Sequence, residues 1–459
     1  MDTSFDAVIV GAGQAGPPLA GRLTAVGWKI ALVERGKIGG TCVNTGCTPT
    51  KAMVASAQAA HMARRGAEYG FETGANVRVD LKRVKARKDA IVGNSRSKDE
   101  SWLTNMNGCT LLRGTAQFEA PHRLRVGDQV LTAKHIFLNV GARPRIPDLP
   151  GVDGIPYLTS TTILDLEEVP EHLIIVGGSF VGLEFAQMFR RFGAEVTVVE
   201  RQPHLLSRED DDIRDGVRGA LEAEGIQFRL NAECVRLSQR EGKTVVHVSC
   251  REGDPEAIGT AVLLAVGRVP NTDDLGLEKA GISLEKNGFV EVDDQLRTSV
   301  EGIWALGDCN GRGAFTHTSY NDFEIVAANL LDGEPRRLSD RIPVYALYVD
   351  PPFARVGMNE REVRASGKPA RMGIRPMSRV NRAIEKGETR GLMKVLVDAQ
   401  SEQILGASIF GVGGDEAVHC ILTAMYARKP ASLITHSVHI HPTVSELIPS
   451  VFEDLKPLT

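Results

Sequence analysis

The chain contains two copies of a strand, glycine-rich turn, helix and strand, and this duplication limits its possible folds more than any other feature. In the first copy, residues 7–10 predict a strand, residues 16–27 a helix and residues 29–33 a second strand. The second copy starts at residue 172, about 165 residues later. A strand–helix–strand unit this short places its two strands parallel, so each copy predicts its own doubly wound α/β sheet.

The first glycine-rich turn has the sequence Gly11-Ala-Gly-Gln-Ala-Gly16 and fits the pattern GxGxxG. Gly11 permits the tight turn, Gly13 lets the backbone approach a pyrophosphate, and Gly16 lets the helix pack closely on the strand. The pyrophosphate then lies at the helix N-terminus, where free N–H groups favour an anion. Glu34 ends the next strand and is predicted to accept hydrogen bonds from an adenosine ribose. We therefore expect a dinucleotide site here.

The second turn, Gly177-Gly-Ser-Phe-Val-Gly182, has Ser179 in place of the middle glycine. We still expect nucleotide binding, because the serine hydroxyl can donate to a pyrophosphate. Glu200 at the following strand end favours NADH, since a carboxylate repels a 2′-phosphate. Arg201 beside it could instead hold that phosphate, so the choice between NADH and NADPH stays open with a lean toward NADH.

Two cysteines, Cys42 and Cys47, stand close together in the segment Gly39–Lys51. Their i, i+5 spacing does not make them helical neighbours, but Gly46 can supply the backbone bend that brings them within bridging range. A structural zinc site needs four ligands, and no second cysteine pair or cysteine–histidine pair lies nearby. A helix predicted to start at about Pro49 would lower a thiol pKa, which favours a reactive pair over an inert one.

At this segment the chain resembles the FAD-dependent pyridine nucleotide–disulfide oxidoreductases, the family of dihydrolipoamide dehydrogenase, glutathione reductase and mercuric reductase. Residues 39–51 resemble the family's redox-active disulfide signature. Further along, residues 139–144 and 265–271 look like the two linker motifs, residues 298–308 like the second FAD motif, and residues 439–446 like the C-terminal catalytic segment. The resemblance therefore extends over nearly the whole chain.

The resemblance implies an α/β fold with two Rossmann-like dinucleotide-binding domains, for FAD and NAD(P), and a C-terminal α+β dimerisation domain. The FAD domain would comprise residues 1–148 and 271–338, the NAD(P) domain residues 149–270 and the dimerisation domain residues 339–459. The implied cofactors are FAD and either NADH or NADPH. The active form would be a homodimer, because in the family the catalytic histidine comes from the partner subunit.

Catalytic roles follow from the same resemblance. Cys42 would be the interchange thiol that attacks the acceptor, and Cys47 would face the flavin and form the charge-transfer thiolate. His441 would be the acid–base group, oriented by Glu446. Lys51 and Glu184 would form an ion pair near flavin N5, and Phe180 would cover the nicotinamide pocket. The cofactor-binding positions would be Gly11, Gly13, Gly16, Glu34, Arg35, Gly40, Thr41, Lys51, Gly141 and Asp308 for FAD, and Gly177, Phe180, Gly182, Glu200, Arg201 and Gly267 for NAD(P)H.

The sequence leaves three functions open: reduction of a small disulfide, reduction of a soft metal ion, and redox sensing with little turnover. The threonines at positions 45, 48 and 50 make the signature most similar to a subgroup labelled mercuric reductase, but residues 450–459 lack the cysteine pair of mercuric reductases. A small-molecule disulfide is therefore the first expectation. Reduction of Hg(II) or Cu(II) by the same pair is the alternative, since soft thiolates select such ions. A low-turnover flavin-binding redox sensor is the third, against which the intact set Cys42, Cys47, His441 and Glu446 argues.

Composition and charge argue against a nucleic-acid-binding protein, a membrane protein and a secreted disulfide-rich protein. The formal net charge of −4 gives no general attraction to nucleic acid or anionic lipid, and no run of about 18 residues lacks charge, so neither kind of partner and no membrane span is expected. The seven cysteines are dispersed except for the pair at 42 and 47, which indicates a reducing cytoplasm rather than a secreted disulfide framework. Four of them, Cys109, Cys234, Cys250 and Cys420, are expected to pack as small hydrophobes, and no dedicated metal site is expected.

Overall fold

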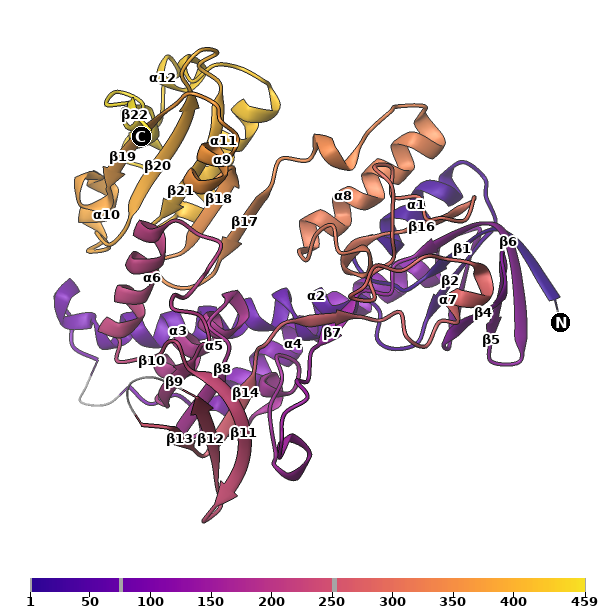
Figure 1. The fold of residues 1–459 in the computed structure, drawn as a ribbon, viewed down its shortest axis with the longest axis horizontal. Helices are drawn as coiled ribbons and strands as arrows, with labels where there is room; N and C mark the ends of the chain where they lie inside the picture. The colour runs from indigo at the N-terminus through magenta and orange to yellow at the C-terminus, as the bar shows by residue number, and fades with distance from the viewer. Residues whose placement is uncertain (1, 74–76, 250–253, 459) are drawn as a thin grey trace.

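The computed structural model describes residues 2–73, 77–249 and 254–458. Figure 1 shows three lobes: one at the right that contains the N-terminus, a second at the lower left, and a third at the upper left that contains the end of the chain. Two long helices, α3 (Cys47–Arg64) and α4 (Leu81–Thr104), run between the first and second lobes. No helix among the described residues is both long and apolar enough to cross a lipid bilayer.

The first lobe is built on a seven-stranded sheet in the order β3-β2-β1-β6-β5-β4, with β16 paired to β6. Its parallel strands are β1 (Asp2–Val10), β2 (Ile30–Glu34), β3 (Cys109–Arg113), β6 (Gln129–Leu138) and β16 (Ile303–Ala305), and β4 (Ala116–Ala120) and β5 (Arg123–Val126) are antiparallel. The central strands contain buried aliphatic runs, residues 7–10 of β1 and residues 30–33 of β2, because both faces of the sheet are covered there. The helix α1 (Gly16–Ala25) packs on these two strands.

The second lobe repeats this plan. Its parallel sheet has the order β10-β9-β8-β14, made from β8 (His172–Val176), β9 (Glu195–Val199), β10 (Gln227–Arg229) and β14 (Ala261–Leu264). The helix α5 (Phe180–Phe192) connects β8 to β9, and a small antiparallel sheet of β11 (Glu233–Arg240), β12 (Lys243–Ser249) and β13 (Glu256–Gly259) adds to the lobe. The two predicted linker motifs, residues 139–144 and 265–271, flank this lobe and pair with each other through β7 (Ala142–Pro144) and β15 (Arg268–Pro270).

The third lobe has an antiparallel sheet in the order β17-β18-β21-β20-β19-β22. These strands are β17 (Val344–Leu347), β18 (Phe353–Gly357), β19 (Ala370–Pro376), β20 (Leu392–Asp398), β21 (Ile404–Phe410) and β22 (Lys456–Pro457), and α11 (Gly414–Tyr426) packs on β18 and β21. Two Rossmann-like lobes followed by an α+β lobe confirm the expected fold class.

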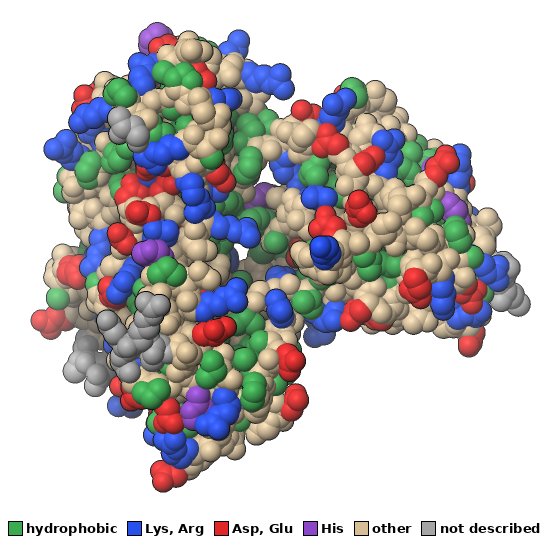
Figure 2. Space-filling model, viewed as in Figure 1, with side chains coloured by type: hydrophobic (Ala, Val, Ile, Leu, Met, Phe, Trp, Pro, Cys, Tyr) green, Lys and Arg blue, Asp and Glu red, His purple; other side chains and the backbone are tan. Residues whose placement is uncertain are grey.

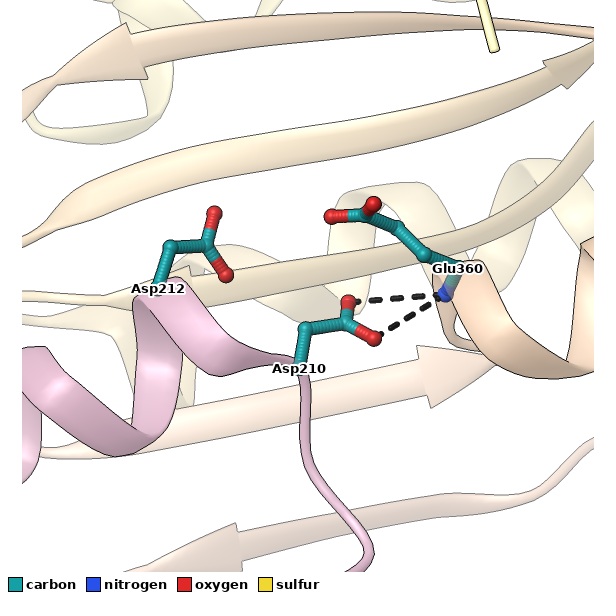
Figure 3. A group of neighbouring side chains, drawn as sticks. All are labelled: Asp210, Asp212 and Glu360. Carbon is teal, nitrogen blue, oxygen red and sulfur yellow. Dashed lines mark hydrogen bonds between the residues drawn. The ribbon is translucent and has the colours of Figure 1, made fainter. Parts of the chain in front are cut away.

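A buried lysine joins the second lobe to the third. The Lys394 ammonium on β20 lies 2.9 Å from Asp210, 2.6 Å from Asp212 and 2.5 Å from Glu360, and its side chain is 1% exposed. Asp210 and Asp212 stand at the start of α6 (Asp211–Ala223), and Glu360 begins α9 (Glu360–Ala365), where its N–H donates to Asp210 (Figure 3). A buried charge needs compensation, and the three carboxylates neutralise the Lys394 ammonium. Because Asp210 and Asp212 belong to the second lobe and Lys394 to the third, these ion pairs connect the two lobes.

The remaining cysteines pack into the cores. Cys109, Cys234 and Cys420 are half-buried against three different apolar clusters, as expected, and Cys309 is fully buried. Cys250 lies outside the described residues.

Candidate active site

A cavity of about 910 Å³ opens where the three lobes meet. Figure 2 shows the surface hollowed between the lobes. The predicted site residues that line the cavity are Gly11, Gly13, Glu34, Arg35, Gly40, Thr41, Cys42, Cys47, Lys51, Gly141, Phe180, Glu184 and Asp308. The predicted residues outside its lining are Gly16, Gly177, Gly182, Glu200, Arg201, Gly267, His441 and Glu446.

The first glycine turn has no room for side chains at its ends. Gly11 has φ +106°, and a Cβ there would lie 2.3 Å from the carbonyl oxygen of Asn139. A Cβ at Gly16 would lie 2.4 Å from the carbonyl oxygen of Gly11. A Cβ at Gly13 would lie 3.4 Å from its nearest neighbour, Nδ2 of Asn139, which is an ordinary contact distance. The protein itself therefore does not require glycine at this position, but a closely approaching ligand would. The geometry fits a pyrophosphate at the start of α1.

Replacing Gly11 with alanine is expected to remove bound FAD and to destabilise the fold by about 2 kcal/mol or more, because the new methyl group meets a backbone carbonyl in a strained conformation. The flavin-to-protein ratio and thermal unfolding measure both effects. Gly27→Ala is the control, since Gly27 also has positive φ but a Cβ there meets nothing within 4 Å. If the two variants lost equal amounts of flavin, a close approach at Gly11 would not be needed for binding.

Asn139 contacts the first glycine turn, although the sequence alone indicates no consequence for this residue. Its side chain is buried, its Nδ2 donates to the carbonyl oxygen of Gly11 over 3.1 Å, and its backbone N–H donates to Val10 over 2.8 Å. Asn139 directly follows β6, the neighbour of β1 in the sheet. Asn139 therefore stabilises the glycine turn through these two hydrogen bonds. The sequence does not show this role, because it depends on β6 pairing with β1 in the sheet.

The acidic residues at the two strand ends brace their own glycine turns. Glu34 accepts hydrogen bonds from the N–H groups of Ala12 (2.8 Å) and Gly36 (2.6 Å). Glu200 accepts from Gly178 (2.7 Å) and Gln202 (2.8 Å) in the same arrangement. This equivalence is a further mark of the duplication. It also gives each carboxylate a structural task beside its predicted contact with a ribose.

The middle of the cavity presents an acid and a cation that fit a polar ligand chain. Burial raises the pKa of the Asp308 carboxyl, and the Nε atom of Arg268 lies 3.6 Å from it. That Nε atom is buried and has no hydrogen-bond partner among the described residues. This wall therefore offers a carboxyl group and a cationic donor that makes no hydrogen bond, which fits an oxygen-rich ligand such as the ribityl and pyrophosphate groups of FAD.

The two cysteines lie on consecutive helices separated by one glycine. Cys42 is on α2 (Gly40–Thr45), and Cys47 is the first residue of α3. At Gly46 a Cβ would lie 2.8 Å from the carbonyl oxygen of Thr41, so the junction requires glycine. The helix begins two residues before the predicted start at Pro49. Both cysteines are free thiols in this structure, and Cys47 stands at the helix N-terminus.

The two thiols differ in their electrostatics. The Cys42 thiol donates to Cys47, and this bond, together with the Thr316 hydroxyl and the Lys51 ammonium, lowers the pKa of Cys47 to about 6 against the opposing effect of burial. The same bond to Cys47 and burial raise the pKa of Cys42 well above its ordinary value. Near neutral pH the pair therefore carries a thiolate on Cys47 and a proton on Cys42.

Thr316 is a second residue that the sequence did not indicate. It begins α8 (Thr316–Ala327), lines the cavity, and its Oγ1 lies 3.3 Å from the Sγ of Cys47. No motif marks it, and it is 269 residues from Cys47 in the chain.

Replacing Thr316 with valine is expected to move the midpoint of Cys47 alkylation upward by about one pH unit, because one donor to the thiolate is lost. In the wild type, reactivity is present above the pKa of about 6 and lost as the pH falls through it. Mass spectrometry of the reduced protein alkylated at different pH values resolves the two thiols. Thr316→Ser keeps the hydroxyl and should restore the wild-type profile; identical profiles for valine and serine would contradict the assignment.

The predicted ion pair is present in the lining of the cavity. Lys51 Nζ lies 2.5 Å from Glu184 Oε2, and Glu184 Oε1 accepts from the backbone N–H of Tyr348 over 2.9 Å. The Lys51 ammonium also lies over the Tyr348 ring, 4.6 Å from its centroid. Lys51 is one helical turn after Cys47, Glu184 comes from α5 and Tyr348 from the third lobe, so these contacts join the second and third lobes to the cysteine helix.

The predicted histidine–glutamate pair is also formed, but away from the cavity. His441 Nδ1 lies 2.9 Å from Glu446 Oε2, and the histidine side chain is 69% exposed. Two neighbouring apolar side chains are strongly exposed as well, Val438 at 100% and Ile440 at 79%. Within one subunit the pair is not brought to Cys42.

Comparison with known proteins places these features in a family. Residues 5–322 match the model described as "Pyridine nucleotide-disulphide oxidoreductase", and residues 344–451 match its dimerisation domain. The probable pyridine nucleotide-disulfide oxidoreductase RclA of Escherichia coli is 36% identical, with 98% of this chain and 99% of RclA covered. A mercuric reductase of Staphylococcus aureus is 30% identical, with 97% of this chain and 81% of the relative covered.

A solved structure agrees with the sequence match. The Cu(II) complex of the HOCl-induced flavoprotein disulfide reductase RclA superimposes with a TM-score of 0.90 at 35% identity, covering 98% of this chain and 99% of that one. Enzymes of this kind use FAD and a nicotinamide nucleotide to act on sulfur groups, which is the chemistry expected from the cysteine pair and the two nucleotide units. The chain belongs to the pyridine nucleotide-disulphide oxidoreductases and is a flavoprotein oxidoreductase that uses FAD with NADH or NADPH.

Proposed function

We propose that this protein reduces a small disulfide with electrons from NADH or NADPH, and that Cys42 and Cys47 are the thiols that do so. The observation that carries the proposal is the arrangement of a protonated Cys42 and a thiolate Cys47 in one cavity with the Lys51–Glu184 pair. When bound, FAD supplies the conversion of two-electron hydride chemistry into thiol chemistry.

The proposed cofactor contacts follow the two glycine turns. Gly11, Gly13, Gly16, Glu34, Arg35, Gly40, Thr41, Gly141 and Asp308 would hold FAD, with Lys51 near its reactive end. Gly177, Gly182, Glu200, Arg201, Gly267 and Phe180 would serve the nicotinamide nucleotide. Ser179 supports binding at the second turn, because its exposed side chain makes no capping bond and is free to donate to a pyrophosphate. Glu200 favours NADH, whereas the exposed Arg201 could bind the 2′-phosphate of NADPH, so both nucleotides are included in the proposal.

The thiol steps balance as a two-electron exchange. Cys42, once deprotonated, attacks one sulfur of the acceptor disulfide, forming a mixed disulfide and releasing the first acceptor sulfur as a thiolate, which takes up the proton that Cys42 lost. The Cys47 thiolate then attacks the Cys42 sulfur, forming the Cys42–Cys47 disulfide and releasing the second. Because its pKa is raised, Cys42 needs a base, and His441 is the proposed one. Glu446 would fix the ring of that histidine through Nδ1.

A homodimer is part of the proposal, because His441 has to reach Cys42 from elsewhere. The exposed segment around Val438 and Ile440 and the dimerisation-domain match support it. The dispersed cysteines support a cytoplasmic location.

Reduction of a soft metal ion is the second candidate. A mercuric reductase is among the relatives, and the RclA structure is a Cu(II) complex. The Cys47 thiolate is the ligand type that such ions prefer.

An acceptor panel tests the proposal. The purified flavoprotein is supplied with NADH or NADPH and with small disulfides, Hg(II) or Cu(II) in separate reactions. Turnover with one or more disulfides and not with the metal ions supports the disulfide reading. Turnover with the metals alone would replace it with the second candidate, and no turnover with any acceptor would favour a redox sensor.

A further inference from the structure

Phe180 stands between the second nucleotide turn and the cysteine end of the cavity. It is the first residue of α5, whose N-terminus lies within the segment Gly177–Gly182, and its side chain lines the cavity together with Glu184. A nicotinamide that extends from a pyrophosphate at this helix N-terminus toward Lys51 has to pass the Phe180 ring. The residues that hold this ring therefore affect nucleotide binding.

Two aromatic rings form the seat of Phe180. Its centroid lies 5.4 Å from that of Tyr345 and 6.4 Å from that of Phe315. Tyr345 and Phe315 stack on each other at 5.6 Å with only 8° between their planes. Tyr345 comes from β17 of the third lobe and Phe315 from the residue before α8, so two other lobes hold a ring of the second.

The Tyr345 ring is itself fixed by buried charges. Its hydroxyl donates to Glu209 over 2.6 Å, and the Arg355 guanidinium lies over its face, 5.0 Å from the centroid. Arg355 also lies 3.5 Å from Glu209, and both charged side chains are nearly buried, at 7% and 2% exposed. A buried carboxylate paired in this way holds its hydroxyl partner in one orientation.

We infer that Tyr345, anchored by Glu209 and Arg355, is a positioning residue that holds Phe180 across the path of the nicotinamide. The inference rests on the proposed nucleotide site at the second turn. Because the bound nicotinamide has to displace Phe180, contacts that stabilise the ring in its seat weaken nucleotide binding. Loss of the Tyr345 and Phe315 contacts to Phe180 should therefore tighten nucleotide binding, whereas a general destabilisation of the fold would weaken it.

The test is a double-mutant cycle on the flavin-loaded dimer, with Kd values for NAD⁺ and NADP⁺ measured by calorimetry. Tyr345→Leu removes the ring and is expected to lower Kd by on the order of two- to tenfold, the range for an aromatic pair. Tyr345→Phe keeps the stack, loses the bond to Glu209, and should give a smaller change of the same sign. In a Phe180→Ala background, Tyr345→Leu should leave Kd unchanged.

Tyr69→Phe is the matched control. The Tyr69 hydroxyl also makes a bond between lobes, to the carbonyl oxygen of Lys386 over 2.5 Å, and Tyr69 does not line the cavity. Its Kd should match the wild type. A raised Kd in Tyr345→Leu and Tyr345→Phe, or an equal change with and without Phe180, would overturn the inference. Failure of the proposed nucleotide site is distinguished by the wild type, which would then bind neither NAD⁺ nor NADP⁺, whereas failure of disulfide reduction would leave these Kd values measurable.

Discussion

Replacing Cys42 with serine is expected to reduce turnover of the disulfide acceptor by about a thousandfold or more, because the attacking sulfur is lost. NAD(P)H-dependent reduction of a one-electron dye should persist, since the Lys51–Glu184 pair and the cavity remain. The two activities are measured on the same preparation. This separation of activities would distinguish the thiol function from simple loss of the cofactor.

Cys109→Ser is the matched control, because Cys109 is a half-buried thiol in the first sheet and does not line the cavity. It should keep both activities. If Cys42→Ser retained its disulfide turnover, the thiol mechanism would be refuted, and only electron transfer to dyes would remain.

The second large effect is expected at His441. His441→Gln should lower disulfide turnover by about 10²- to 10⁴-fold, the range for loss of a general acid–base group. Steady-state rates of disulfide turnover by the wild type and the variant measure this effect.

Hybrid dimers test where this histidine acts. Subunits with Cys42→Ser and subunits with His441→Gln are each expected to be inactive alone. In a hybrid dimer, Cys42 of one subunit meets His441 of the other at one intact site, so about half of the wild-type activity per hybrid dimer should return. Absence of any recovery in purified hybrids would mean that His441 does not act across the interface.

Much of this site could be predicted because its signals are local in sequence. The glycine turns, the acidic strand ends and the cysteine segment each lie within about 35 residues and carry their own geometry. Lys51 and Glu184 are far apart, and only the family resemblance paired them; the structure places them 2.5 Å apart.

The residues that sequence reasoning missed act across the fold. Thr316, Asn139 and Tyr345 contact their partners from different lobes or strands, and no short motif contains both members of a pair. The start of α3 was misplaced for a local reason. Pro49 is typical of a first helical turn and predicts a start at that position, whereas the bend at Gly46 starts the helix at Cys47.

The most direct test of the account is a thiol count before and after reduction by the nucleotide. The oxidised flavoprotein is treated anaerobically with NADH or NADPH, alkylated, and analysed by mass spectrometry that resolves Cys42 from Cys47. The account predicts that both thiols are protected as a disulfide beforehand and that both become labelled after the nucleotide is added. Oxidation of the nucleotide with both cysteines still protected would contradict it.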